Sequence, residues 1–258
     1  MNKNNRFKWR SFQVQAFQLY KWLIVIPGFV LLTVVFGTTA ILSSYIMSAK
    51  SASFNGVLWA RFTALLACMR LNVVGRENVD AKQSYVVVVN HQSAMDIIAL
   101  YGWLGIDFRW VMKQEIRKVP FLGYACYRVG HVYIDRKNRE AAIKSLETAK
   151  GQIHSGTSVL FFPEGTRTST SEVQSFKKGA FKMALDLGLP VLPITLNGAD
   201  YVMPNKTLKL MPGTVDMTIH PPISTEGMTE DNIEALMQQS FIAVNSAIPN
   251  ATHTATAQ

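Results

Sequence analysis

A histidine and an aspartate five residues apart, His91 and Asp96, directly follow an apolar, valine-rich run at residues 85–89. An imidazole can accept the proton of an attacking hydroxyl, and a neighbouring carboxylate can orient the ring and stabilise its charged form. On one continuous helix the two side chains would point roughly 140° apart. They meet only if His91 lies in a turn and a helix begins near Ser93, as the capping-box pattern Ser93-x-x-Asp96 predicts. On these residues alone, a purely structural turn and cap is an equal alternative.

The second cluster is the stretch Phe-Pro-Glu-Gly-Thr-Arg at residues 162–167, which follows another apolar run. Pro163 and Gly165 predict a tight turn at the end of a strand, where the ligand sites of open α/β sheets lie. The planar guanidinium of Arg167, presented by a rigid turn, suits the oxygens of a phosphate monoester. A plain surface ion pair between Glu164 and Arg167 is the alternative.

Two further stretches and the cysteines give weaker signals. Residues 130–136 place charges at the end of a short strand, and residues 191–194 form a strand bounded by prolines, which indicates a structural role. Cys68 and Cys126 have neither metal-ligand nor disulfide spacing, so we expect both to be packing residues. The sequence has no Gly-x-Ser-x-Gly nucleophile elbow and no metal-binding cluster, so we expect neither a covalent serine intermediate nor a metal.

Strands and helices alternate from residue 77 onward. We predict strands at residues 85–90, 108–113, 132–134, 158–162, 191–196 and 215–220, and helices at 94–104, 139–154, 178–187 and 229–247, the last capped by Thr229. This alternation predicts an α/β fold with a central mixed, mostly parallel sheet flanked by helices.

The net charge of the chain is concentrated at its N-terminal end. Nine Lys and Arg precede the first acidic residue, Glu77, whereas the other 17 Lys and Arg balance all 17 Asp and Glu. An uncharged, apolar run occupies residues 22–49, and a second segment at residues 54–69 has apolar side chains at helical spacing. A cationic, apolar leader favours a lipid bilayer over nucleic acid as the partner.

The apolar run at residues 22–49 is long enough to cross a bilayer, which takes roughly 20 residues, and too long for a signal peptide. We expect residues 1–70 to form membrane-anchoring helices and residues 71–258 to form one domain. The five cations before Trp22 predict a cytoplasmic N-terminus. A two-helix or re-entrant hairpin then keeps the domain on the cytoplasmic side, whereas a single crossing does not. A long buried core helix is the remaining alternative.

In their order and spacing, these stretches resemble the glycerolipid acyltransferase family, and within it the 1-acyl-sn-glycerol-3-phosphate acyltransferases. His91-x4-Asp96 is similar to the catalytic block of that family, and residues 130–136, 162–167 and 191–194 are similar to its second, third and fourth blocks. Lys113, with Pro120 and Gly123, resembles the stretch between the first two blocks, and Ser169 occupies a familiar following position. The resemblance covers roughly residues 70–220 and is more specific for the family than for the acceptor.

The resemblance implies an enzyme of phospholipid biosynthesis at the inner membrane, with its catalytic domain on the cytoplasmic face. It implies transfer of a fatty acyl group from acyl-coenzyme A or acyl-carrier protein to the sn-2 hydroxyl of lysophosphatidic acid, without a cofactor. We expect His91 to be the general base and Asp96 its partner. Arg167 would bind the acceptor phosphate, with Lys113 and Arg136 as secondary contacts.

The same resemblance places Glu164, Gly165 and Thr166 among the substrate-binding residues. We expect Glu164 to orient Arg167 or the loop, and backbone N–H groups around Gly165 are candidates for holding the tetrahedral oxyanion. Two alternatives remain. One is another lysolipid acceptor, which the three cations disfavour, and the other is a catalytically silent membrane-binding module, which the intact His–Asp pair disfavours.

Overall fold

Four consecutive valines form the centre of the molecule. In the computed structural model, which describes residues 14–135, 138–151, 153, 156–168 and 172–249, they make up strand β2 (Val86–Val89) and are fully buried. Val86 and Val88 pack into the apolar core on one face of the sheet, and Val87 and Val89 into the core on the other. A strand buried on both faces is typical of a sheet that helices cover on each side.

The sheet has seven strands in the order β1-β7-β6-β2-β5-β3-β4. Neighbouring strands are parallel except for β6 and β7, so the predicted mixed, mostly parallel sheet is confirmed. Besides β2, the strands are β1 (Met69–Val74), β3 (Asp107–Lys113), β4 (Val132–Ile134), β5 (Thr157–Phe161), β6 (Val191–Asn197) and β7 (Gly213–Ile219).

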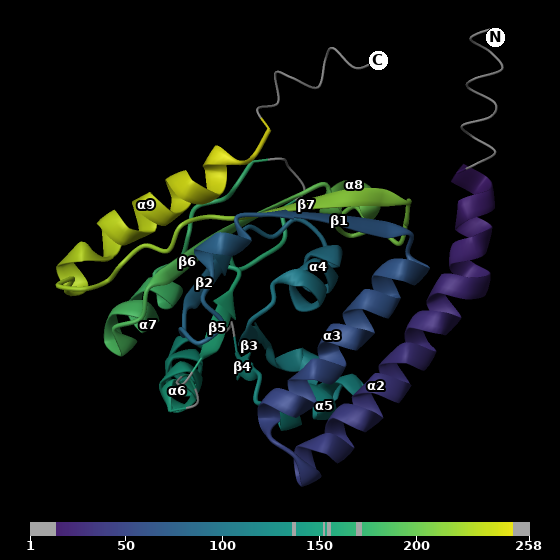
Figure 1. The fold of residues 1–258 in the computed structure, drawn as a ribbon, viewed down its shortest axis with the longest axis horizontal. Helices are drawn as coiled ribbons and strands as arrows, with labels where there is room; N and C mark the ends of the chain where they lie inside the picture. The colour runs from purple at the N-terminus through teal and green to yellow at the C-terminus, as the bar shows by residue number, and fades with distance from the viewer. Residues whose placement is uncertain (1–13, 136–137, 152, 154–155, 169–171, 250–258) are drawn as a thin grey trace, which may run out of the picture.

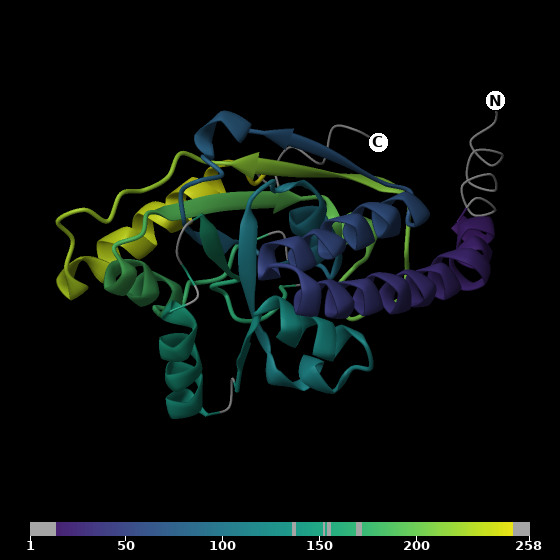
Figure 2. The ribbon, with the colours of Figure 1, turned by 60° about the horizontal axis from the view of Figure 1, so that its bottom comes forward.

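Helices cover both faces of this sheet (Figures 1 and 2). One face packs against α3 (Ala49–Leu66) and α4 (Met95–Trp103). The other face packs against α6 (Arg139–Lys150), α7 (Gly179–Leu187) and α9 (Ile233–Ser246). The central strands are therefore fixed from both sides, and the turns at their ends remain free to carry functional groups.

The N-terminal segment folds into a hairpin of two helices (Figure 2). The first is continuous from Val14 to Ile46, with a π-helical turn at Lys21–Val25, and its last part is α2 (Ile26–Ile46). The wider π turn shifts the hydrogen-bond register just before Pro27, which has no N–H to donate, so the proline does not end the helix. After Met47 and Ser48 the chain reverses, and α3 packs along α2.

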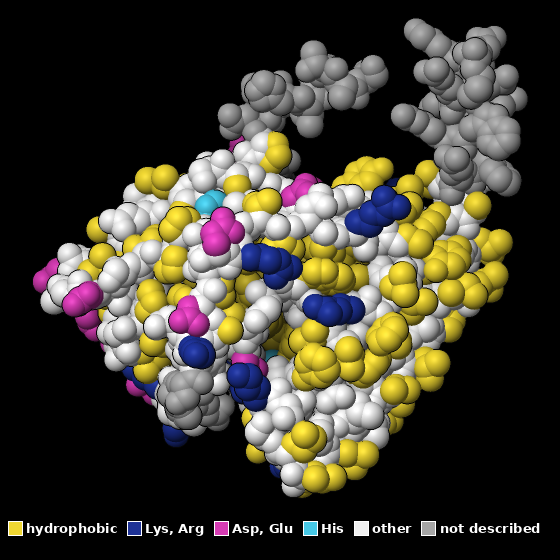
Figure 3. All heavy atoms as spheres, viewed as in Figure 1, with side chains coloured by type: hydrophobic (Ala, Val, Ile, Leu, Met, Phe, Trp, Pro, Cys, Tyr) yellow, Lys and Arg dark blue, Asp and Glu magenta, His cyan; other side chains and the backbone are white. Residues whose placement is uncertain are grey.

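The first leader helix is apolar and largely exposed. Among the described residues it is the one helix long and apolar enough to cross a membrane, and only 11% of its apolar window is buried. The alternative of a long buried core helix is therefore wrong. Apolar side chains gather over the two leader helices (Figure 3), and the most exposed include Leu23, Leu31, Leu42, Phe54 and Leu65. Exposed apolar surface of this extent is typical of a surface that contacts a membrane or another protein.

The junction between the leader and the sheet differs from the prediction. Residues 69–74 form β1, an edge strand parallel to β7, where we expected the second leader helix to reach Met69. Cys68 adopts a left-handed conformation (φ 51°) that ends the helix and turns the chain into the strand. Its side chain is exposed, so its predicted packing role is wrong. The expected boundary between residues 70 and 71 falls inside this strand.

The remaining elements follow the sequence closely. All other predicted strands and helices are present, with ends shifted by at most four residues. Thr229 forms a reciprocal capping box with Asn232 at the start of the last helical segment, so that predicted cap is confirmed. The helix α5 (Leu122–Val129) is an element that the sequence analysis missed.

Candidate active site

Three strand ends meet at one edge of the sheet. β5 lies between β2 and β3, with Val88 opposite Phe161 and Trp110 opposite Leu160. Because the three strands are parallel, the turn after β2, the turn after β5 and the end of β3 lie side by side. These segments carry most of the residues predicted from the sequence, namely His91, Asp96, residues 163–167 and Lys113.

Asp96 is the hydrogen-bonding centre of the turn after β2. Its side chain is 1% exposed, and its Oδ2 accepts hydrogen bonds from Nδ1 of His91 and from the backbone N–H groups of Gln92 and Ser93, each at 2.8 Å. Converging donors of this kind stabilise a buried carboxylate. Because the carboxylate accepts, Nδ1 of His91 carries the proton and Nε2 keeps its lone pair. In the neutral tautomer that this contact selects, the turn presents Nε2 of His91 as a group that can act as a base.

The helix that carries Asp96 begins later than we predicted. α4 starts at Met95, one residue after the predicted start, and its cap position by backbone geometry is Ala94 rather than Ser93. The Ser93 side chain still caps the helix, since its hydroxyl accepts the N–H of Met95 (3.1 Å) and donates to the carbonyl of Met203 (2.7 Å). Only the Asp96 half of the capping box is formed. This later start leaves His91 in the turn, where its ring can fold back onto Asp96.

Stacking fixes the ring of His91. Its centroid lies 3.7 Å from that of Phe162, with 11° between the ring planes, and Phe162 stacks in turn on Trp110 at 5.5 Å. The His91 side chain is 12% exposed. The stack and the bond to Asp96 together hold the imidazole in one orientation, so little reorganisation is needed before it accepts a proton.

Glu164 ties the two turns together. It is buried, and its carboxylate accepts the backbone N–H of His91 at 2.7 Å through Oε1 and that of Gln174 at 2.9 Å through Oε2. The N–H of Thr168 donates to the His91 carbonyl at 2.9 Å. Burial raises the pKa of Glu164, and the two backbone hydrogen bonds act in the opposite direction. Glu164 makes no ion pair within the described part of the chain, so it holds the loop and the His91 backbone rather than the Arg167 guanidinium.

The turn after β5 depends on Gly165. Its φ of +78° favours glycine, and an added Cβ would lie 2.6 Å from Nζ of Lys177. Its N–H donates to the carbonyl of Phe162 at 3.0 Å, so the Gly165 amide itself is not available for an oxyanion. Thr166 and Arg167 follow it and are exposed. The turn thus presents Arg167 from a fixed backbone.

The other predicted cations are distributed around this turn. Lys113 ends β3, is about half exposed, and pairs with Glu115 at 3.1 Å. Arg136 and Ser169 lie outside the described residues. Lys177, which the sequence analysis did not single out, comes close to Gly165 only through the folding of the chain.

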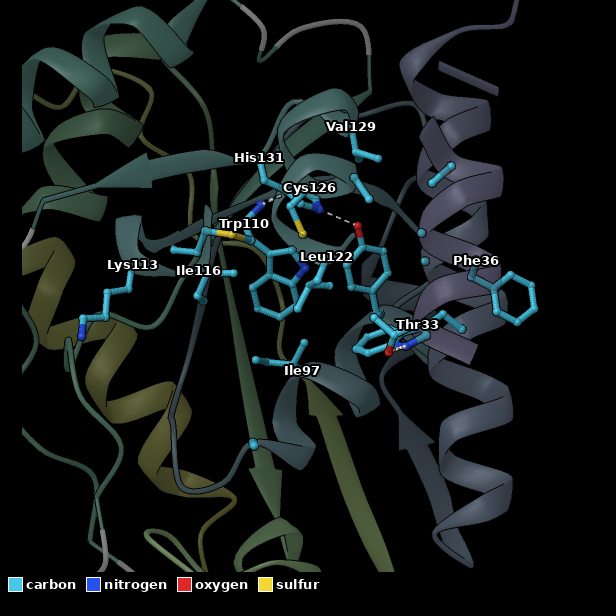
Figure 4. A pocket seen from close by; sticks show the side chains of 18 of the residues that line it. Thr33, Phe36, Ile97, Trp110, Lys113, Ile116, Leu122, Cys126, Val129 and His131 are labelled. Atoms are coloured by element: carbon cyan, nitrogen blue, oxygen red, sulfur yellow. Dashed lines mark hydrogen bonds between the residues drawn. The ribbon is translucent and has the colours of Figure 1, made fainter. Parts of the chain in front are cut away.

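An apolar cavity of about 390 Å³ lies beside the turn (Figure 4). His91, Arg167 and Lys113 contribute to its lining, and most of the remaining wall is apolar. Both leader helices supply part of this wall, which nothing in the leader's composition predicts. The wall includes Phe36, Gly37 and Ala40 of α2, Trp59 of α3, Ile97 of α4, and Leu122, Cys126 and Val129 of α5.

A buried histidine, His131, also lines this cavity. Its Nδ1 accepts the backbone N–H of Trp110 at 3.2 Å, so its Nε2 carries the proton and donates to the Tyr101 hydroxyl at 2.7 Å. Burial, with the nearby charge of Arg109, lowers the pKa of His131 to about 3. Protonation would set a second N–H against that of Trp110. His131 is therefore a neutral structural group of the cavity wall.

Comparisons with known proteins agree with this architecture. The acyltransferase family model matches residues 70–197. A 1-acyl-sn-glycerol-3-phosphate acyltransferase of Chlamydomonas reinhardtii is 32% identical over 92% of this chain and 70% of its own length. The yeast (Saccharomyces cerevisiae) enzyme of the same name is 34% identical over 66% of this chain and 56% of its own length. The crystal structure of the 1-acyl-sn-glycerophosphate (LPA) acyltransferase PlsC from Thermotoga maritima superposes with a TM-score of 0.74 and 25% identity, over 92% of this chain and 97% of that one.

His131 predicts a pH dependence of stability. The pKa of His131 is lowered to about 3 in the folded protein. Its contribution to the free energy of unfolding is therefore complete above about pH 6.5 and is lost as the pH falls from 6.5 towards 3. Lowering the pH from 7.5 to 5.5 should therefore cost about 1.4 kcal/mol of unfolding free energy through this residue. Denaturant unfolding in detergent at both pH values measures this change.

The control is His131→Asn, whose Oδ1 can accept the Trp110 N–H and cannot be protonated. This variant should lose that part of the pH dependence. An unchanged pH dependence in His131→Asn would show that His131 is not the group responsible.

Proposed function

The chain belongs to the family of 1-acyl-sn-glycerol-3-phosphate acyltransferases, and we propose that it transfers a fatty acyl group from a thioester to the sn-2 hydroxyl of lysophosphatidic acid by general-base catalysis. The product is phosphatidic acid, so the reaction belongs to phospholipid biosynthesis. The observation that carries the proposal is the 2.8 Å contact between Nδ1 of His91 and Oδ2 of Asp96, beside an apolar cavity whose lining includes two cations.

The proton moves through His91. Its Nε2 accepts the proton of the sn-2 hydroxyl as the hydroxyl oxygen attacks the thioester carbonyl carbon, and Asp96 stabilises the resulting imidazolium. The tetrahedral intermediate then collapses, the C–S bond breaks, and His91 returns the proton to the leaving thiolate, which is released as the thiol. We assign the oxyanion to the backbone N–H groups that follow Gly165 in the turn, at Thr166 and Arg167. Attack is direct, so a covalent acyl-enzyme is not required.

The two kinds of lining fit the two ends of an amphipathic substrate. The apolar wall suits an acyl chain, whereas Arg167 and Lys113 suit the dianionic phosphate of lysophosphatidic acid. Arg167 takes part in no ion pair among the residues that the structure describes, which leaves its guanidinium available for a ligand. A lysolipid acceptor without this phosphate would leave the Arg167 guanidinium unpaired, which is why we favour lysophosphatidic acid.

The acyl donor is a soluble thioester, acyl-coenzyme A or acyl-carrier protein, and we propose that the reaction uses it as a co-substrate without a further cofactor. Such donors are cytosolic, so the catalytic domain would lie on the cytoplasmic face of the inner membrane. An exposed, apolar leader next to the cavity supports membrane association of the protein. The acceptor, itself a membrane lipid, would then reach the site from the bilayer.

Hydrogen bonds join both ends of the first leader helix to the catalytic domain. Near its start, Nζ of Lys21 donates to the carbonyl of Leu208 at 2.8 Å. At its far end, Nε of Arg128 on α5 donates to the Ser44 hydroxyl at 2.9 Å. A helix held at both ends by one domain lies alongside that domain. We therefore favour a hairpin embedded in one leaflet over a helix that crosses the bilayer.

The role of His91 predicts a large loss of turnover on its removal. His91→Ala should lower the rate of acyl transfer to lysophosphatidic acid by roughly 10²–10⁴-fold, and Asp96→Asn should also lower it strongly. The assay uses purified protein and a labelled acyl-thioester. His220→Gln is the control, because His220 is bonded to Thr195 and does not line the cavity. Near wild-type turnover in a folded His91→Ala protein would rule out the mechanism, and an inactive wild type would favour the catalytically silent module.

The role of Arg167 predicts a selective effect on the acceptor. Arg167→Lys keeps the charge and loses the bidentate fork, so it should raise the KM for lysophosphatidic acid roughly tenfold with the KM for the acyl donor unchanged. Arg70→Lys, an exposed change on the edge strand β1, serves as the control. If only the donor KM rises, Arg167 binds the thioester substrate and the assignment is reversed.

The one-leaflet hairpin predicts the side of the membrane from which each segment is reached. Single cysteines at Lys50 and Glu172, with Cys68 and Cys126 replaced, should both be protected from an impermeant thiol reagent in intact cells and should react after permeabilisation. Labelling of residue 50 alone from outside would indicate a hairpin that spans the bilayer. Labelling of residue 172 from outside would contradict the cytoplasmic placement of the domain.

A further inference from the structure

The loop at residues 203–211 joins three separate parts of the molecule. It connects α8 (Ala199–Val202) to β7, and we call it the α8–β7 loop. It contacts the turn after β2, the turn after β5 and the first leader helix. The catalytic mechanism above uses no residue of this loop.

On one side the loop holds the two catalytic turns. The Met203 carbonyl accepts the hydroxyl of Ser93 at 2.7 Å. The side-chain amide of Asn205 donates to the carbonyl of Arg167 at 3.0 Å and also lies 3.4 Å from that of Thr168. The position of the α8–β7 loop therefore bears directly on the backbone that presents the Arg167 guanidinium.

On the other side the loop forms hydrogen bonds with the first leader helix. The Leu208 carbonyl accepts Nζ of Lys21 at 2.8 Å, and the Leu210 carbonyl accepts the side-chain amide of Gln18 at 2.7 Å. Lys21 is the last cation before the uncharged run at residues 22–49. Lysines that flank such a run sit at the membrane–water interface. Lys21 itself is buried by its contact with the loop, so the loop lies where the polar start of the leader helix meets the apolar run, the level at which lipid headgroups are expected.

The exposed side chains of the loop suit contact with lipid headgroups. Lys206, Leu208 and Lys209 are exposed, Leu208 by 64%. Neither lysine belongs to an ion pair with any described residue. Two unpaired cations around an exposed leucine match an anionic headgroup above the start of the acyl chains.

Lys206 also occupies a strained position. It has φ +61°, in a turn closed by the hydrogen bond from the N–H of Thr207 to the carbonyl of Pro204 at 3.2 Å. Turns with a positive φ at this position favour Gly or Asn, and a lysine there is less stable. Backbone strain at a single exposed residue indicates that its side chain serves a function.

We propose that the α8–β7 loop binds the headgroups of anionic phospholipids through Lys206 and Lys209, and that this contact positions the Arg167 turn through Asn205. The first half is independent of catalysis, and the second half rests on the proposed function. Anionic lipid would thus act at a surface site distinct from the cavity and improve capture of the acceptor.

Hydrogen exchange of the full-length protein in vesicles tests the binding. Addition of phosphatidylglycerol to phosphatidylcholine vesicles should slow exchange across residues 203–211. Each lysine near an anionic surface contributes about a fivefold factor, so Lys206→Gln/Lys209→Gln should need at least about tenfold more phosphatidylglycerol for the same protection. Lys82→Gln/Lys144→Gln, which removes two exposed lysines elsewhere, should respond as the wild type does.

Three results would overturn the binding proposal. The first is an unchanged response in Lys206→Gln/Lys209→Gln, and the second is no protection in the wild type. The third is that inorganic phosphate, added to phosphatidylcholine vesicles, protects the loop as well as phosphatidylglycerol does. That result would identify a soluble anion as the ligand.

Asn205→Ala tests the link to the Arg167 turn. This variant should keep the lipid-dependent protection of residues 203–211 and lose the lipid-dependent fall in the KM for lysophosphatidic acid, with kcat little changed. A KM that still falls as phosphatidylglycerol is added would refute the link. An inactive wild type would overturn the proposed function instead, and the exchange experiment would still decide the lipid site.

Discussion

The site depends on one buried carboxylate. Three N–H groups converge on Oδ2 of Asp96, and without them the charge at a 1% exposed side chain would be costly. Two of these donors belong to the backbone between the strand and the helix, so the turn folds around the carboxylate. Glu164 repeats this arrangement from the neighbouring turn, since it accepts the N–H of His91. The His91 imidazole is thus held by acidic side chains that need not touch a substrate.

The leader is part of the site as well as an anchor. Its helices supply one wall of the cavity, with the small residues Gly37 and Ala40 on α2 where the wall meets α5. An added Cβ at Gly37 would already be in contact with Phe121, at 3.6 Å. An amphipathic substrate needs an apolar region and a charged region within one molecule's length. The two leader helices supply the apolar region, and the ends of the strands against which they pack supply the charged region.

Much of the fold could be predicted from sequence periodicity. The valine run of β2 is buried on both faces, so it had to be a central strand, and the alternation of elements then implied a mostly parallel sheet. The edge strand β1 was missed because it begins directly after Cys68, whose left-handed backbone no local pattern announces. The start of α4 was misplaced by one residue, although the Ser93 N–H donates to Asp96 as the capping-box pattern predicts.

The sequence by itself determined which chemical groups are available, because residue types and spacing are local: a histidine and a carboxylate that can meet only across a turn, and an arginine on a rigid loop. It also determined the apolar, cationic character of the leader. Only the tertiary structure decided that Glu164 holds the backbone of His91, that the leader completes the cavity, and that the α8–β7 loop joins the leader to the Arg167 turn. These contacts join residues that lie far apart in the chain. Their partners are selected by the packing of strands and helices, which no spacing along the sequence encodes.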